Sequence, residues 1–321
     1  MNKDTDKSGA WVEVERFLRS RHSQGVIERG RASADTARSY GKTLRAFVRF
    51  CDVQFGVLGA EAVRRLHIEE WLVANRDRPG GWSAATTGHH LSCVRSFFRW
   101  MVEEGRLALS PADGIRSPRR EAVAKRALRG EDLDRLLAWL RSGARTKRVY
   151  APLIEFMART GARAGEVCAM DREDWSFDLD GHGLHVVLTG KGNKKRALHH
   201  VGTAGEACEG ERRAFVGRML EYRSWRDARH VDERALWLSG RGSRLCRETL
   251  GARMRAWGKV LGLEGYTAHC LRHGFVTSLL AAGTDVATVS ELVGHANPQV
   301  TMAVYAHTDE RKKEEALGGV F

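Results

Sequence analysis

Apolar residues in the first hundred positions recur three and four apart, which is the spacing of one face of a helix. In "DTARSYGKTLRAFVRFC" this stripe consists of Tyr40, Leu44, Phe47, Val48 and Cys51. In "SAATTGHHLSCVRSFFRWMVEEG" it consists of Leu91, Val94, Phe97, Phe98 and Met101. Ser83 is suited to cap the start of the second helix and Gly105 its end. The pattern predicts a helical domain over residues 11–110.

The apolar periodicity stops in "PADGIRSPRREAVAKRALRG", residues 111–130. The segment holds two of the chain's five prolines and six basic residues against two acidic ones. That composition is typical of an exposed linker. We expect residues 111–121 to join two domains, and the basic residues of the wider segment to lie along a phosphate backbone: Arg116, Arg119, Arg120, Lys125 and Arg126.

Residues 122–321 begin with a helical pattern in "GEDLDRLLAWLRSG", followed by two helices separated by a break at Gly161. Two β-leaning runs joined by the turn "GKGN" occur in "GLHVVLTGKGNKKRALHHV". From about residue 205 the pattern favours helices. The sequence therefore predicts a mainly α protein of two domains, in which the second is mixed α/β with a small sheet or hairpin.

The net charge of the chain indicates which class of partner it is expected to bind. The chain has 53 Lys and Arg against 40 Asp and Glu, a net charge of +13 and a pI near 9.8. Such a balance favours a polyanion. On the first helices the basic residues form stripes without acidic neighbours, where a solvated face would usually mix signs. We expect DNA contacts from Arg38, Lys42, Arg45, Arg49, Arg95 and Arg99.

The cysteines and the lengths of the apolar runs indicate where in the cell the protein is expected. The six cysteines are scattered without a C-x-x-C pair, which favours reduced thiols. No apolar run approaches the roughly 18 residues of a membrane span, and "MNKDTDKSGA" lacks the apolar region of a signal peptide. We expect a cytoplasmic protein with no membrane partner.

Candidate chemistry gathers in short motifs of the second half. In "AHCLRHGF", His269 and Arg272 are three apart and share one side of a helix. A metal site with Cys270 and His273 would lack the acid of H-E-x-x-H and a third ligand nearby, so a packed or surface histidine pair is the commoner interpretation. We expect no metal and no other cofactor.

"TGARAGEV" places Arg163 at the start of a helix, where anions are favoured, with Glu166 one turn on to orient its guanidinium. "TGKGNKK" places Lys191 at a hairpin tip, and "ELVGHANPQVTMAVYAH" brings His295 and Tyr305. Singly, each has an ordinary structural explanation, and a tyrosine in such a helix is more often packing. Together they could serve one phosphodiester: arginines clamp the phosphate, histidine and lysine move protons, and tyrosine attacks.

These motifs, in this order, resemble those of the tyrosine recombinase (phage integrase) family, and most closely its compact Xer-type members. The resemblance covers about residues 122–310, and "TARSYGKTLRAFVRFC" with "LSPADGI" resembles the family's SAM-like core-binding domain. It implies a site-specific recombinase that cuts and rejoins duplex DNA through a 3′-phosphotyrosyl link without metal or ATP. The implied catalytic residues are Arg163, Lys191, His269, Arg272, His295 and Tyr305, with Glu166 behind them.

The resemblance also implies partners: double-stranded DNA carrying a recombination site, and cyclic tetramers on two sites through the residues after Tyr305. A second recombinase or accessory protein stays open as a further partner. Departures are Ala162, where the family more often has Leu, and the lysines at 194 and 195, which compete with Lys191. A type IB topoisomerase and a catalytically silent DNA-binding protein of recombinase descent stay open as alternatives. A metal-dependent nuclease would need clustered carboxylates, which these motifs lack.

Overall fold

The chain forms two compact units, Met1–Val123 and Ala124–Phe321, in a computed structural model. The structure describes residues 9–20, 34–57, 59–119, 127–144, 149–179, 183–190, 193–199, 201, 209–229, 233–294 and 302. Each unit has its own hydrophobic core. Among these residues, no helix combines the length and apolar character that crossing a membrane requires.

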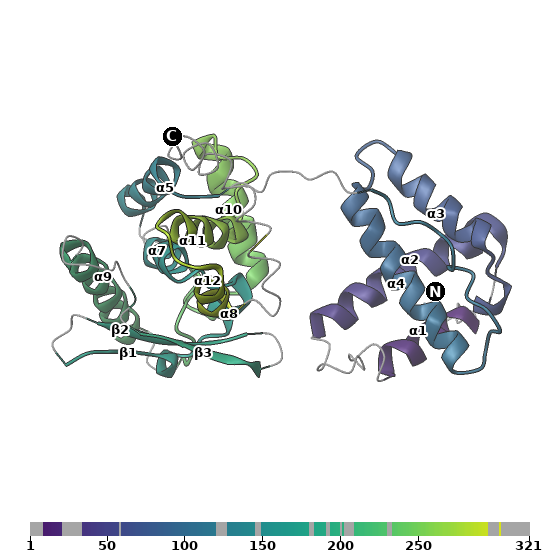
Figure 1. Ribbon diagram of the computed structural model, residues 1–321, viewed down its shortest axis with the longest axis horizontal. Helices are drawn as coiled ribbons and strands as arrows, with labels where there is room; N and C mark the ends of the chain where they lie inside the picture. The colour runs from purple at the N-terminus through teal and green to yellow at the C-terminus, as the bar shows by residue number, and fades with distance from the viewer. Residues whose placement is uncertain are drawn as a thin grey trace, which may run out of the picture. The chain divides into compact units, whose positions relative to one another are not determined.

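The first unit is helical, as predicted. Its elements are α1 (Gly9–Arg19), α2 (Ala34–Phe55), η1 (Ala60–Ala62), α3 (Arg65–Asp77) and α4 (Ala84–Glu103) (Figure 1). Both predicted apolar stripes enter the core, with Tyr40 partly buried at its edge. The Ser83 hydroxyl caps α4 by accepting the N–H of Thr86 at 3.2 Å. At the other end Glu104 is the C-cap, and Gly105 follows with φ +69°.

The segment after α4 differs from the predicted exposed linker at its start. Ala112 and Ile115 are buried in the core of the first unit. Arg95 fixes this stretch by donating to the Ile115 carbonyl and, at 3.1 Å, to the Ser117 hydroxyl. Two apolar side chains and a side-chain donor were enough to hold it against α4, despite the charge around it. Arg120, Lys125 and Arg126 lie outside the described residues.

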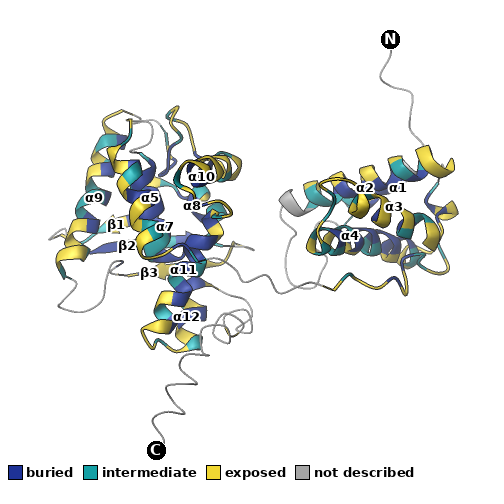
Figure 2. Cartoon of the chain, turned by 90° about the horizontal axis from the view of Figure 1, so that it is seen from above, coloured by how far each residue is buried: buried dark blue, intermediate teal, exposed yellow. Residues whose placement is uncertain are grey.

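In the second unit the neighbouring helices α7 and α11 lie at the centre, and the other elements pack around them (Figure 1). Its helices are α5 (Glu131–Ser142), α7 (Tyr150–Thr160), α8 (Ala164–Ala169), η2 (Arg172–Asp174), α9 (Glu209–Asp227), α10 (Arg247–Leu261), α11 (Ala268–Ala281) and α12 (Val286–Val293). Buried residues fill the interior around α7, α11 and β2, whereas much of α9 and α12 is exposed (Figure 2). The helical stretch expected over "NPQVTMAVYAH" lies outside the described residues apart from Met302.

A three-stranded antiparallel sheet completes this unit, in the order β1 (Trp175–Phe177), β2 (Leu184–Thr189) and β3 (Lys195–Leu198). The two predicted strands are confirmed, with Leu188 paired to Arg196. The third strand, β1, was missed because three residues are too few to show an alternating pattern. It pairs with β2 through Trp175, opposite Val186.

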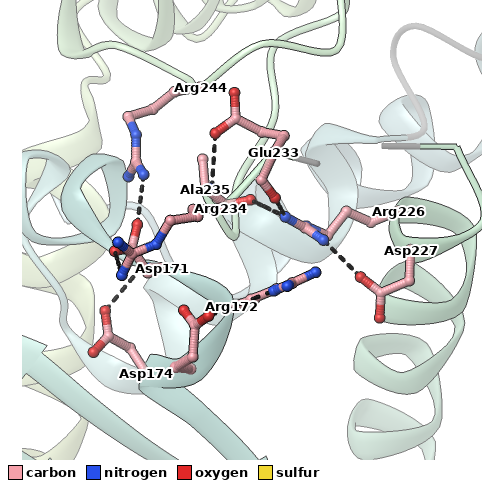
Figure 3. A network of polar contacts seen from close by, with 10 residues as sticks. Asp171, Arg172, Asp174, Arg226, Asp227, Glu233, Arg234, Ala235 and Arg244 are labelled. Atoms are coloured by element: carbon pink, nitrogen blue, oxygen red, sulfur yellow. Dashed lines mark hydrogen bonds and ion pairs between the residues drawn. The ribbon is translucent and has the colours of Figure 1, made fainter. Parts of the chain in front are cut away.

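The expectation that the chain from about residue 205 is helical is wrong for residues 233–246, which form an irregular loop with isolated bridges at Ala235 and Leu238. Buried Arg226 explains this conformation (Figure 3), because it donates to the Ala235 carbonyl at 3.0 Å and to the Glu233 carbonyl. Asp171 Oδ1 accepts a hydrogen bond from Arg244 Nη2 at 2.5 Å. Side chains distant in sequence therefore bind backbone groups that a helix would use internally.

A buried carboxylate at Glu155 joins three parts of the second unit. It accepts hydrogen bonds from Arg218 at 2.5 Å and Arg141 at 2.8 Å, and Arg159 lies 3.4 Å away. Burial alone would raise the pKa of Glu155, but hydrogen bonding from Arg218 and the three positive charges outweigh it and lower the pKa below its ordinary 4.5. A folded-state pKa below the unfolded one contributes stability above about pH 4.5 that is lost as pH falls through the lowered value.

We therefore expect Glu155→Gln to lower the free energy of unfolding at pH 7 by about 2 kcal/mol, since Arg141, Arg159 and Arg218, which are partly exposed, lose their buried counter-charge. The difference from wild type should shrink as the pH falls below about 4.5, where wild type loses the same charge. Urea unfolding at neutral and acid pH measures this. Glu221→Gln, on the exposed side of α9, is the control. An equal loss in both variants at pH 7 would contradict the prediction.

Candidate active site

Arg163 stands at the start of α8, as predicted. Gly161 ends α7 in the left-handed conformation, φ +60°, where a Cβ would lie 2.5 Å from the Phe275 ring. Arg163 is then extended as the N-cap of α8. Glu166 accepts the backbone N–H of Arg163 and its Nη1, both at 2.7 Å. The carboxylate therefore orients the guanidinium, which agrees with the geometry expected from the sequence.

Glu166 has a second partner that sequence reasoning missed. Arg196 on β3 donates Nη1 and Nη2 to the two carboxylate oxygens at 2.7 and 2.8 Å. A signal was present in the sequence: Arg196 lies two residues before apolar Leu198, so both side chains belong on the inner face of the strand. An arginine directed inward needs a carboxylate. The pair of Arg196 with Glu166 depends on the register of β3, which is short and highly charged and therefore hard to place from the sequence.

Burial and charge determine the state of Glu166, which is 4% exposed. Burial raises the pKa of this carboxyl, but hydrogen bonds from Arg196 and from Arg163, together with the positive charge of Arg196, lower it overall. Glu166 is therefore an ionised carboxylate surrounded by N–H donors. It holds two arginines from different elements, α8 and β3, in one place.

Arg272 approaches the same place from α11. Its side chain is almost fully buried, and it donates Nη1 to the Gly161 carbonyl at 2.8 Å and Nη2 to the Val293 carbonyl at 2.6 Å. Burial and the nearby positive charge of Arg163 lower the pKa of Arg272, while Glu166 raises it. Because a guanidinium starts from a very high pKa, Arg272 keeps its charge at neutral pH.

Both arginines meet at the C-terminal end of α12. Arg163 Nη2 donates to the Gly294 carbonyl at 2.8 Å, next to the carbonyl that Arg272 contacts. Gly294 has φ +64°, and a Cβ there would lie 3.1 Å from Arg196 Nη1. His295 follows Gly294 in the sequence, but Lys191, His295 and Tyr305 lie outside the described residues. On the hairpin, a Cβ at Gly190, which precedes Lys191, would lie 3.3 Å from Glu166 Oε1.

His269 lies on the first turn of α11 and is exposed, three residues before Arg272. The part of the chain that the structure describes contains no group of three or more side chains arranged to hold a metal ion. The described centre of the site is therefore two guanidiniums, of Arg163 and Arg272, one buried carboxylate with its second arginine, and an exposed histidine three residues before Arg272. A net positive, partly buried arrangement of this kind suits a phosphodiester.

The candidate DNA contacts of the first unit are mostly on its surface. Arg38, Lys42, Arg45, Arg49, Arg99, Arg116 and Arg119 are exposed. Arg45 is also paired with Glu15 at 2.5 Å. Arg95 is only partly exposed and holds the segment after α4, so its donors serve the fold. Lys42 and Arg49 form no ion pair with the residues that the structure describes, so their charges suit a phosphate contact better than that of Arg95, whose donors bind the Ile115 carbonyl and Ser117.

Known proteins resemble the chain along most of its length. Residues 126–312 match the Phage integrase family, and residues 14–105 match the Phage integrase, N-terminal SAM-like domain. Tyrosine recombinase XerD of Bifidobacterium longum (strain NCC 2705) is 30% identical over 88% of this chain and 89% of its own. Tyrosine recombinase XerC of Salmonella typhi is 30% identical, over 93% and 91%. The XerH site-specific recombinase bound to a palindromic difH substrate shares the fold, with a TM-score of 0.71, 19% identity and 99% of both chains covered.

Proposed function

We propose, since this chain belongs to the phage integrase family, that it is a site-specific DNA recombinase of the compact Xer type. It cuts and rejoins duplex DNA through a 3′-phosphotyrosyl link. The observation that supports this most strongly is the convergence of Arg163 and Arg272 on the end of α12, with buried Glu166 behind Arg163. Two guanidiniums from different helices held at one point can contact the oxygens of one phosphate.

Each residue then has a role in the chemistry. Arg163 and Arg272 hold the scissile phosphate and stabilise charge as phosphorus becomes five-coordinate. The Tyr305 oxygen forms a bond to phosphorus, the bond from phosphorus to the 5′-oxygen breaks, and Lys191 gives that oxygen a proton. His269 accepts the proton that the Tyr305 hydroxyl loses as it attacks, and His295 supports the phosphate. A 5′-hydroxyl from a partner duplex reverses the step, so neither ATP nor a metal is needed.

The same proposal extends to organisation. Residues 11–110 form the core-binding domain, onto which the following segment packs through Ala112 and Ile115. The basic residues that continue to position 121 link it to the catalytic domain, 122–321, and both domains contact DNA through basic residues. The active assembly is a tetramer on two sites, in the cytoplasm with the nucleoid, with a second recombinase or accessory protein where the element requires one. The first unit's exposed basic residues and the net charge of +13 support the DNA partner.

The test is a covalent adduct with the full-length protein. Duplexes that the protein binds are first selected from a random pool, then nicked near each phosphate in turn so that cleavage cannot reverse. With EDTA present we expect a protein–DNA band on a denaturing gel, a free 5′-hydroxyl, and DNA attached to the peptide containing residue 305. Binding without any adduct would favour the silent DNA-binding alternative. Relaxation of supercoiled plasmids lacking the site would favour the topoisomerase.

A further inference from the structure

Arg196 lies next to the candidate site, and the proposed chemistry gives it no role. Glu166 receives four hydrogen bonds, two from Arg163 and two from the guanidinium of Arg196. Arg196 is itself largely buried, with 13% of its side chain exposed. Four donors satisfy the carboxylate of Glu166. Arg196 Nε is buried and has no hydrogen-bond partner among the described residues.

The charge of Arg196 affects the net charge that the centre of the site presents to a phosphate. Arg163, Arg272 and Arg196 against Glu166 leave two net positive charges at the centre. Without Arg196, the buried carboxylate would have Arg163 as its main counter-charge. Arg163 would then be neutralised and drawn toward Glu166, and only one net positive charge would face a phosphate that gains charge as it is attacked.

Arg196 also contacts the backbone that holds Arg163 from the other side. A Cβ at Gly294 would lie 3.1 Å from Arg196 Nη1 and 3.4 Å from its Cδ, so Arg196 packs directly against this glycine. The Gly294 carbonyl accepts Arg163 Nη2 at 2.8 Å. Arg196 therefore touches both groups that fix the direction of Arg163, the carboxylate and the end of α12.

We propose that Arg196 is a positioning residue for DNA cleavage: it balances the charge of Glu166 and supports Gly294, so that Arg163 stays charged and directed at the phosphate. This rests on the proposed function. Removing Arg196 should slow the chemical step much more than it weakens DNA binding. Removing the carboxylate at the same time should restore the charge balance and recover part of the rate.

The experiment measures single-turnover adduct formation at saturating nicked DNA, and separately the dissociation constant for intact DNA. We expect Arg196→Gln to slow adduct formation about 100-fold, the scale of one lost charge-stabilising donor, with DNA affinity changed less than about threefold. Arg196→Lys, which keeps the charge, should lose less. The double variant Glu166→Gln/Arg196→Gln should be at least about tenfold faster than Arg196→Gln. Arg213→Gln on α9, an exposed arginine paired with Glu209, is the control.

Either of two results would overturn the inference. The first is a double variant that forms the adduct as slowly as Arg196→Gln. The second is an Arg196→Gln variant that forms it no more slowly than Arg213→Gln. If Arg196→Gln alone fails to fold, Arg196→Lys and the double variant carry the same test, because both keep two net positive charges at the centre. Adduct formation within about tenfold of wild type in both, even where their unfolding midpoints differ, supports the inference, and rates that fall in step with the unfolding midpoint overturn it. Absence of any adduct from wild type would instead refute the proposed function.

Discussion

Tyr305→Phe is expected to bind its DNA site as tightly as wild type and to form no covalent adduct on nicked duplexes. The substitution removes a single oxygen and keeps the ring, so packing changes little, while phenylalanine has no atom that can bond to phosphorus. Loss of a nucleophile lowers rates by about 10⁴-fold or more. A denaturing gel with wild type and variant side by side measures the adduct, and gel retardation of the intact site measures binding.

The other four tyrosines make this prediction specific. Tyr266 is the matched control, because it lies in the same unit and donates its hydroxyl to Asp132 at 2.7 Å. Tyr266→Phe should cost some stability and leave adduct formation within a fewfold of wild type. An adduct that survives in Tyr305→Phe would mean that another residue is the nucleophile. Loss of DNA binding in that variant would mean that the ring, rather than its oxygen, was needed.

The predictable part of the site is the part made within one stretch of chain. The glycine break at Gly161, an arginine two residues on and an acid one turn later lie within six residues, so local helix chemistry places Arg163 and Glu166 together. The core stripes of α2 and α4 were predictable for the same reason, because helical periodicity is local.

What sequence reasoning missed depends on long-range contacts. The inward direction of Arg196 follows from pairing with β2, and the carbonyls that hold Arg272 belong to Gly161 and Val293, on two other elements. Backbone acceptors leave no trace in side-chain patterns. The irregular loop around Ala235 likewise follows from a buried arginine nine residues away, Arg226, whose charge would suggest a surface position.

Arg272→Gln is the second large effect. We expect adduct formation to slow by about 10³-fold, because the variant loses both a charge and a planar set of donors at a phosphate whose transition state is more negative than its ground state. The variant should also be less stable by about 3 kcal/mol, since the carbonyls of Gly161 and Val293 lose a charged donor in a buried place. Single-turnover rates and urea unfolding measure the two effects separately.

The stability loss needs a matched control, and Arg226 provides it. This arginine is also fully buried in the second unit and also donates to backbone carbonyls, those of Ala235 and Glu233, but it has no contact with Arg163, Glu166 or Arg272 among its recorded bonds. Arg226→Gln should therefore lose comparable stability and, at a temperature where it is folded, keep most of its cleavage rate. If both variants slowed equally, the loss in Arg272→Gln would come from weakened folding, and the phosphate contact of Arg272 would be wrong. A gap of about 100-fold or more between them isolates the charge at the phosphate, because burial and backbone bonding are the properties that the two arginines share.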